Sequence, residues 1–164
     1  GRLAADKRTD WVVRAVLEAK NVIPDLSLDI YGEGSGEVQI RKLIEDLDCS
    51  EYIHLCGFQK LDEVYQNYEA YVSASYGETF GVTLLEAIGS GLAVIGFDLP
   101  YGIQVFVDDG KNGYKIRHET IQELAGGIVR LFTEDNLEKF RNCSYKKAKY
   151  NLTEEVEKKW KTVF

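Results

Sequence analysis

The alternation of short apolar runs with segments of helical periodicity constrains the fold of this chain more than any other feature. Residues 93–97, for example, form an apolar run, and residues 83–90 before it have helical spacing. The expected strands are 26–31, 53–55, 70–74, 93–97 and 113–116, and the expected helices are 9–21, 37–47, 61–68, 83–90, 120–132, 136–149 and 153–164. Such alternation favours right-handed β-α-β units. We therefore predict an α/β fold, a doubly wound, Rossmann-like domain with a parallel sheet covered by helices on both faces.

Local signals refine the ends and faces of these elements. Thr9 is expected to cap the first helix, and Gly91 to end the helix before strand 93–97. In helix 37–47, the side chains expected to face the core are Val38, Leu43, Ile44 and Leu47. No repeat or low-complexity linker interrupts the pattern, so residues 1–164 are predicted to form one domain.

Composition excludes several classes of function. A formal net charge of −7 argues against a surface for nucleic acid or anionic membranes. No run of about 18 apolar residues occurs, so no transmembrane segment is expected. The odd number and wide spacing of Cys49, Cys56 and Cys143 disfavour a disulfide scaffold or a zinc site, and favour a reducing, cytoplasmic compartment. The chain begins at Gly1 and contains no methionine, so we expect it to be a piece of a larger protein.

Three glycine-containing loops precede helices, where parallel sheets bind ligands beyond the carboxyl ends of their strands. They are residues 1–7, 32–37 and 77–83. The second loop looks like a dinucleotide fingerprint, but Glu37 stands where the third glycine belongs, and its carboxylate would repel a pyrophosphate. Nicotinamide binding is therefore rejected, and a strand-to-helix turn at the rim of the pocket is favoured for this loop.

The third loop places a glutamate on each side of a helix start. Gly77 and Gly81 allow a sharp turn and a close approach of a ligand, and the first amides of the following helix can bind an anion. Glu78 precedes this end, and Glu86 lies one turn inside the helix. Two sugars flanking a diphosphate would satisfy this arrangement. A solvated Glu78 and a merely helix-favouring Glu86 would also fit, and spacing alone does not separate the two.

The order of motifs along the chain resembles that of retaining glycosyltransferases of the GT4 type. The resemblance covers nearly the whole chain and rests on a conjunction of motifs. They are Glu78-x7-Glu86 with Phe80-Gly81 inside, residues 87–93 (Ala-Ile-Gly-Ser-Gly-Leu-Ala), Gly1-Arg2-Leu3 with Lys7, and residues 31–34, 54–58 and 109–113. It implies a GT-B architecture, in which two Rossmann-like domains face each other across a cleft. This chain would be the C-terminal domain, which holds the nucleotide-sugar donor.

The resemblance also implies a role for individual residues. Glu78 would be the catalytic residue that holds hydroxyls of the transferred sugar. Arg2 and Lys7 would bind the diphosphate, and Glu86 the ribose hydroxyls. The backbone of Phe80, Gly81, Val82 and Thr83 would contact sugar and phosphate, and the loop around Gly57 and Phe58 would border the base.

Two departures from the family pattern stand out. Residues 101–104 read Tyr-Gly-Ile-Gln where family members commonly have Gly-Gly-x-x-Glu. With residues 96–102, this variant is similar to a Gram-positive branch that contains teichoic-acid α-glucosyltransferases and the glycosyltransferases of accessory secretion systems. In addition, the family's first strand would end where Gly1 begins. Without this strand, a central sheet position would be empty or filled otherwise, and Arg2 would lack rigid support. The N-terminal acceptor domain would also be absent from this piece.

The expected function is retaining hexosyl transfer from UDP-glucose or UDP-N-acetylglucosamine to a cell-surface polymer, glycan or protein, with this piece inactive by itself. The expected partners are the nucleotide sugar, the missing N-terminal domain and, as a further candidate, a partner glycosyltransferase subunit. The alternative is a non-catalytic GT-B-like module that scaffolds a partner glycosyltransferase or substrate. No cofactor or metal is expected. The candidate metal ligands Asp46, Asp48, Asp108, Asp109, His54 and His118 read as solvated carboxylates and isolated histidines.

Overall fold

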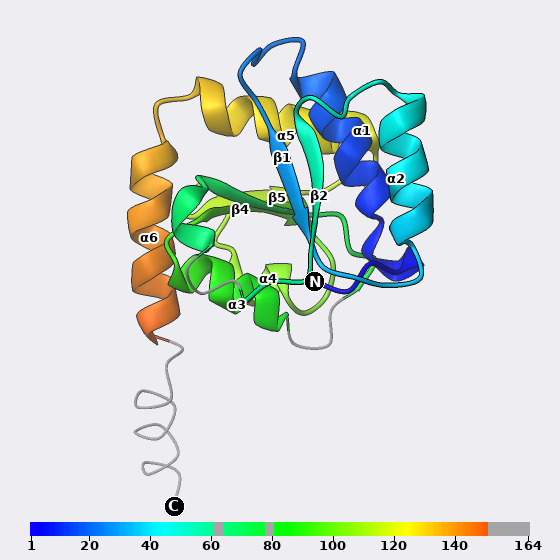
Figure 1. Cartoon of the computed structure of the whole chain (residues 1–164). Coiled ribbons are helices and arrows are strands. Elements are labelled where there is room, and N and C mark those ends of the chain that lie inside the picture. The colour runs from blue at the N-terminus through cyan, green and yellow to red at the C-terminus, as the bar shows by residue number, and fades with distance from the viewer. Residues whose placement is uncertain (61–63, 78–80, 151–164) are drawn as a thin grey trace, which may run out of the picture.

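The computed structural model describes residues 1–60, 64–77 and 81–150, and within them parallel strands alternate with helices (Figure 1). The strands are β1 (Leu28–Tyr31), β2 (Ile53–Gly57), β3 (Ala70–Ser73), β4 (Ala93–Phe97) and β5 (Gly113–Ile116). The helices are α1 (Thr9–Ala19), α2 (Glu37–Asp46), α3 (Val82–Gly89), α4 (Ile103–Phe106), α5 (Ile121–Thr133) and α6 (Leu137–Tyr150), with 3₁₀ turns η1 (Ala5–Lys7) and η2 (Tyr65–Asn67). The five predicted strands and the predicted helices that correspond to α1, α2, α3, α5 and α6 occur in the predicted order. The expected helix 153–164 lies outside the described residues.

The strands form two separate parallel sheets. β1 pairs with β2, while β3, β4 and β5 form a second sheet in that order. Among the described residues, no ladder joins β1 to β3. The predicted parallel direction is confirmed for all of these pairs. No described strand lies between β1 and β3, where the sequence left the central position either empty or filled otherwise.

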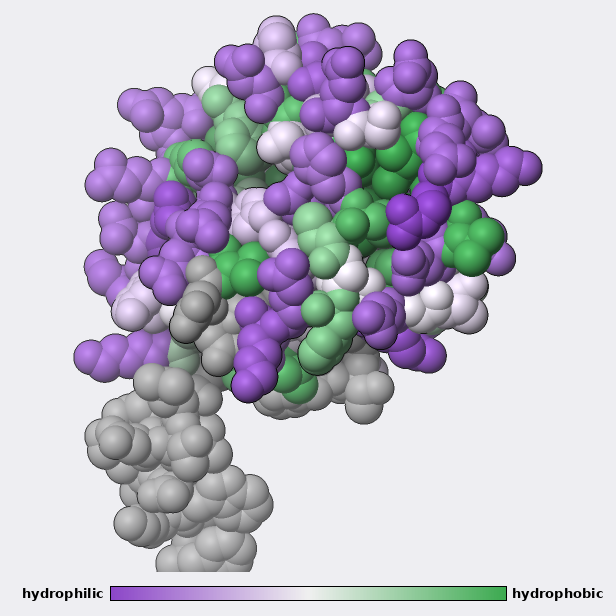
Figure 2. Space-filling view, in the orientation of Figure 1, coloured by the Kyte–Doolittle hydropathy of each residue, from purple (hydrophilic) through white to green (hydrophobic). Residues whose placement is uncertain are grey.

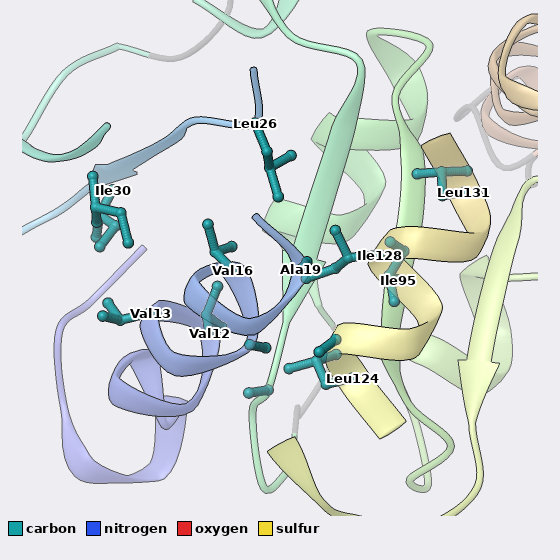
Figure 3. Packing of buried hydrophobic residues seen from close by; sticks show 14 of the residues in the cluster. Val12, Val13, Val16, Ala19, Leu26, Ile30, Ile95, Leu124, Ile128 and Leu131 are labelled. Atoms are coloured by element: carbon teal, nitrogen blue, oxygen red, sulfur yellow. The ribbon is translucent and has the colours of Figure 1, made fainter. Parts of the chain in front are cut away.

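Helices cover both sides of these strands, as a doubly wound fold requires. On one side α1 packs against α5 and α2, and on the other α3 packs against α6 and α4. All five residues of β4 are buried between the two layers. Figure 3 shows side chains of α1 and α5, including Val16 and Ile128, in the space between these helices. The apolar run of residues 93–97 therefore became the strand that is buried on both faces.

Two local predictions were wrong. Thr9 is the first residue of α1 and does not cap it, because Arg8 takes the N-cap position in a left-handed conformation (φ 46°, ψ 44°). Val38 does not face the core and is 76% exposed. The buried stripe of α2 is Ile40 and Ile44, and a residue two positions before Ile40 lies on the opposite side of a helix.

Short elements also departed from the sequence pattern. Strand 26–31 begins only at Leu28. Of the expected helix 61–68, residues 61–63 lie outside the described residues, and the remainder contains only the 3₁₀ turn η2. α4 was not predicted, because four residues carry too little periodicity to be recognised. In the part of the chain that the structure describes, no helix is both long and apolar enough to cross a membrane.

Candidate functional site

A cavity of about 830 Å³ lies between the two sheets. Most of its wall is apolar and comes from β1, β3, α1 and α5, including Ile30, Val72 and Ile128. One end is polar and is formed at the carboxyl ends of the strands. Its lining there includes Arg2, Lys7, Ser75, Gly81, Val82 and Thr83. The cavity thus combines a largely apolar slot between strands with a polar end, and its two lining cations, Arg2 and Lys7, lie at that polar end.

On the face seen in Figure 2, which β1 and β2 cross, apolar side chains reach the surface in the middle and hydrophilic ones surround them.

The first residues of the chain are fixed beside the end of β1. The Gly1 amine donates to the Tyr31 carbonyl (2.6 Å), and the Leu3 amide donates to the Glu33 carbonyl (2.9 Å). The approach is so close that a Cβ atom on Gly32 would lie 1.7 Å from the Gly1 carbonyl oxygen, and Gly32 has φ +140°. Glycine is required there. The backbone on both sides of Arg2 is therefore held by hydrogen bonds, and the expected lack of support does not occur.

The two predicted cations of this segment differ in environment. The Arg2 side chain is 68% exposed and pairs with Asp6 at 3.3 Å, Nη2 to Oδ2. Lys7 is half-buried, and its Nζ donates to Ser75 Oγ at 3.3 Å. Because Ser75 follows β3, this contact joins the N-terminal segment to the loop in front of α3.

The helix end predicted to bind an anion is present. α3 begins at Val82, and Gly81 before it has φ +80°, a conformation suited to glycine. A Cβ atom on Gly81 would lie 3.2 Å from the Gly102 Cα, so the loops in front of α3 and α4 touch. The Val82 and Thr83 amides belong to the first helical turn, which has no intrahelical acceptors. The Thr83 side chain is oriented by Tyr71, whose hydroxyl donates to Thr83 Oγ1 (3.2 Å).

Glu86 lies one turn along α3 and is exposed. The Tyr65 hydroxyl donates to Glu86 Oε2 at 3.4 Å. Burial of Tyr65, together with the neighbouring Tyr71 and Glu86, raises the pKa of the Tyr65 phenol, so it remains a neutral hydrogen-bond donor. Glu86 is not among the residues that line the cavity, but Tyr65 and Thr83 are.

The remaining predicted residues are placed differently. Gly57 ends β2 with φ +67°, and Phe58 follows it with 74% exposure; neither lines the cavity. Glu78 and Phe80 lie outside the described residues. The structure therefore brings together Arg2, Lys7, Gly81, Val82 and Thr83, with Glu86 nearby.

Sequence reasoning missed the residues that hold the predicted ones. Ser75 contacts Lys7, Tyr65 contacts Glu86, and Tyr71 contacts Thr83. Two of the three are tyrosines six residues apart in front of the glycine loop, and this aromatic enrichment was the available signal. Their partners depend on how η2, β3 and α3 pack, which the local sequence does not encode.

The candidate metal ligands have protein partners or lie apart. His54 Nδ1 is 2.7 Å from Asp29 Oδ1, and Lys147 pairs with Asp108 at 2.8 Å. Among the described residues, no three histidine, cysteine or acidic side chains are grouped as a metal site would require.

Comparison with known proteins identifies relatives over nearly the whole chain. The family model "Glycosyl transferases group 1" matches residues 1–150. The chain is 45% identical over 167 residues to the UDP-N-acetylglucosamine–peptide N-acetylglucosaminyltransferase GtfA subunit of Streptococcus pneumoniae, covering 98% of this chain and 33% of the relative. It is 33% identical over 159 residues to the poly(glycerol-phosphate) alpha-glucosyltransferase of Bacillus subtilis, covering 95% of this chain and 24% of the relative.

Solved structures agree with these relatives. The pneumococcal O-GlcNAc transferase GtfA in complex with UDP and GlcNAc matches with a TM-score of 0.93 at 44% identity, over 99% of this chain and 33% of that chain. A GtfA/B complex matches with a TM-score of 0.92 at 42% identity, over 99% of this chain and 34% of that chain. The chain spans about a third of the length of these relatives. With a family model matched over residues 1–150 and the parallel strands in place, the chain belongs to the glycosyl transferases group 1 family and has the fold of a GT-B C-terminal domain.

Proposed function

We propose that this chain binds the nucleotide-sugar donor of a retaining hexosyltransferase. The observation that carries the proposal is the convergence of Lys7 and the start of α3 on the polar end of one cavity. A cation and a helix N-terminus that face the same space are suited to a diphosphate. Because the formal net charge is −7, attraction for a diphosphate has to come from local groups such as Lys7 and the start of α3.

The groups of the donor are assigned from the diphosphate outward. Arg2 and Lys7 would bind phosphate oxygens from one side, and the Val82 and Thr83 amides from the other. Glu86 would accept hydrogen bonds from the ribose hydroxyls, with its carboxylate oriented by Tyr65. Glu78 would hold the transferred sugar; this role rests on the family resemblance.

UDP-glucose and UDP-N-acetylglucosamine are the proposed donors. Support comes from the relatives, one of which is crystallised with UDP and GlcNAc. The proposed acceptor is a cell-surface polymer, glycan or protein. Because the relatives are about three times as long as this chain, the whole enzyme would add an acceptor-binding domain. A partner glycosyltransferase subunit is proposed by analogy with the GtfA/B complex.

We expect residues 1–164 to show no sugar transfer by themselves. Transfer requires donor and acceptor to be held together in reactive geometry, and this chain supplies only the donor side. The measurement is transfer of radiolabelled sugar from UDP-glucose and UDP-N-acetylglucosamine, with and without the joined acceptor domain. Sustained transfer by the 164-residue chain would contradict the expectation.

The alternative function is a non-catalytic GT-B-like module that scaffolds a partner enzyme or substrate. Such a module has no need of a carboxylate beside a helix N-terminus, so the presence of Glu86 and its contact to Tyr65 favour donor binding. Failure of UDP to bind the folded chain, together with no turnover of the whole protein by any nucleotide sugar, would favour the scaffold.

Glu86→Ala should weaken UDP binding by about tenfold or more, because a hydrogen bond to a charged group contributes about 1.5–3 kcal/mol. Glu78→Ala should leave the affinity for UDP nearly unchanged, since UDP carries no hexose. Calorimetric titration of UDP into wild type and both variants measures this difference.

Glu45→Ala, on the exposed face of α2, is the control for loss of a surface carboxylate. Melting curves establish that each variant is folded. Equal losses of UDP affinity in the Glu78 and Glu86 variants would overturn the proposed division between sugar and ribose.

A further inference from the structure

Arg8 joins three parts of the chain at the edge of the polar end. Its Cζ atom lies 4.8 Å from the ring centroid of Trp11 and 4.7 Å from that of Tyr76. Its Nη1 atom pairs with Glu119 Oε2 at 2.6 Å. The guanidinium therefore contacts α1, the loop after β3 and the loop after β5, and its side chain is only 18% exposed.

The backbone of Arg8 is in a conformation that favours glycine. Its φ of 46° and ψ of 44° lie in the left-handed region, and its side chain makes no capping hydrogen bond to α1. Glycine would take this conformation more easily. The contacts of the Arg8 side chain to two aromatic rings and a carboxylate are therefore the contribution that a glycine at this position could not make.

These contacts hold the loop that carries Ser75. Tyr76 is 66% exposed, and the Arg8 guanidinium packs against its ring. The Tyr76 amide donates to the Asp6 carbonyl (2.8 Å), and Ser75 Oγ accepts from Lys7 Nζ (3.3 Å). Trp11 in turn packs edge-on against Phe97 at the end of β4, with ring centroids 5.9 Å apart. A continuous set of contacts thus runs from the core through Trp11 and Arg8 to Tyr76.

We propose that Arg8 is a positioning residue for donor binding. It fixes the loop of residues 75–77 against residues 6–8 and so keeps Ser75 in place to orient the Lys7 ammonium toward the cavity. This role rests on the proposed function, because it matters only if Lys7 binds a diphosphate. Arg8 itself does not line the cavity, and its charge is taken up by Glu119.

The test is UDP titration of folded variants of this chain. Arg8→Gly relieves the backbone conformation but removes the contacts, and we expect it to raise the Kd for UDP about fivefold or more, as loss of a partly buried cation–π pair predicts. Arg8→Lys keeps the charge and can stack on one ring, so it should recover part of the loss. Tyr76→Leu removes the ring without changing charge and should weaken UDP binding in the same direction.

Removing the negative charge of Glu119 distinguishes a positioning role of Arg8 from a long-range effect of charge on UDP binding. Glu119→Gln makes the chain less negative, which by charge alone would strengthen binding of an anion. Loss of the ion pair to Arg8 predicts weaker binding instead. Glu123→Gln makes the same charge change in the first turn of α5, without a contact to Arg8, and should not weaken binding. Opposite effects of the two glutamine variants are therefore expected.

If Glu119→Gln and Glu123→Gln strengthen UDP binding equally, then binding responds only to net charge and the ion pair to Arg8 has no effect on it. That result would overturn the proposal. Unchanged UDP affinity in Arg8→Gly and Tyr76→Leu, with lower melting temperatures, would make Arg8 purely structural and also overturn it. If the wild-type chain itself fails to bind UDP, the proposed function fails first, before Arg8 is tested.

Discussion

Lys7→Glu is expected to lower the affinity of this chain for UDP more than hundredfold. The change removes a charge-assisted contact of about 1.5–3 kcal/mol and places a carboxylate where the diphosphate would lie. Two like charges 4 Å apart repel by about 4 kcal/mol at an effective dielectric constant of 20. A hundredfold loss needs only about 2.7 kcal/mol, so the two effects together exceed it. Isothermal titration calorimetry with UDP measures the change.

Lys42→Glu is the matched control for this prediction. Lys42 is exposed on α2 and does not line the cavity, yet its replacement changes the net charge by the same amount. Its effect on UDP affinity should be small and should vanish at high salt. Similar losses in both variants would show that UDP responds to net charge, and the proposed position of the diphosphate beside Lys7 would be wrong.

Gly113→Ala is expected to have the largest effect on stability. Gly113 is buried in β5, opposite Val94 of β4. An added Cβ atom would lie 1.8 Å from the Val94 carbonyl oxygen, which is backbone and cannot rotate away. β5, an edge strand of its sheet, would have to move away from β4. We expect a loss of about 3 kcal/mol or more in the free energy of unfolding, which corresponds to a melting temperature lower by roughly 6–12 °C.

Gly126→Ala is the same chemical change as Gly113→Ala, but we expect it to stabilise the protein. Gly126 lies inside α5, and a Cβ atom there meets nothing within 4 Å. Alanine should stabilise the helix by about 0.5–1 kcal/mol. Urea unfolding of both variants checks the pair. Comparable stability of the Gly113 variant and wild type would mean that β4 and β5 are not packed as described.

The fold was largely predictable because its strands and helices are separated by clear changes of period. β4 was predicted as a strand from its apolar run, and the parallel direction followed from the helices between strands. The failures have local causes. Val38 is apolar but lies off the stripe of Ile40 and Ile44, and Thr9 lost the cap position to Arg8, whose side-chain contacts come from distant segments.

The site was predictable only in part. Arg2, Lys7, Gly81 and Thr83 were identified from motifs, and the structure gathers them at one cavity. Residues that act on them through packing, such as Tyr65 and Arg8, carry no motif of their own. Lys7 and Ser75 are 68 positions apart, so their contact exists only once α1 and β3 are assembled.

The break between β1 and β3 leaves two strand edges facing the same cavity. In β1, the Leu28 amide donates to the Tyr52 carbonyl beside β2, so the backbone amide and carbonyl of the next residue, Asp29, point away from β2. Just before β3, the Glu69 carbonyl accepts from the Ala93 amide of β4. The backbone groups of Ala70 and Val72 therefore point away from β4. Open edges are templates for further strands. An extended apolar segment could complete both ladders at once, whether it belongs to the same polypeptide or to another molecule. At high concentration, pairing of these edges between copies would lead to aggregation, so binding experiments on this chain are best made dilute and checked by light scattering.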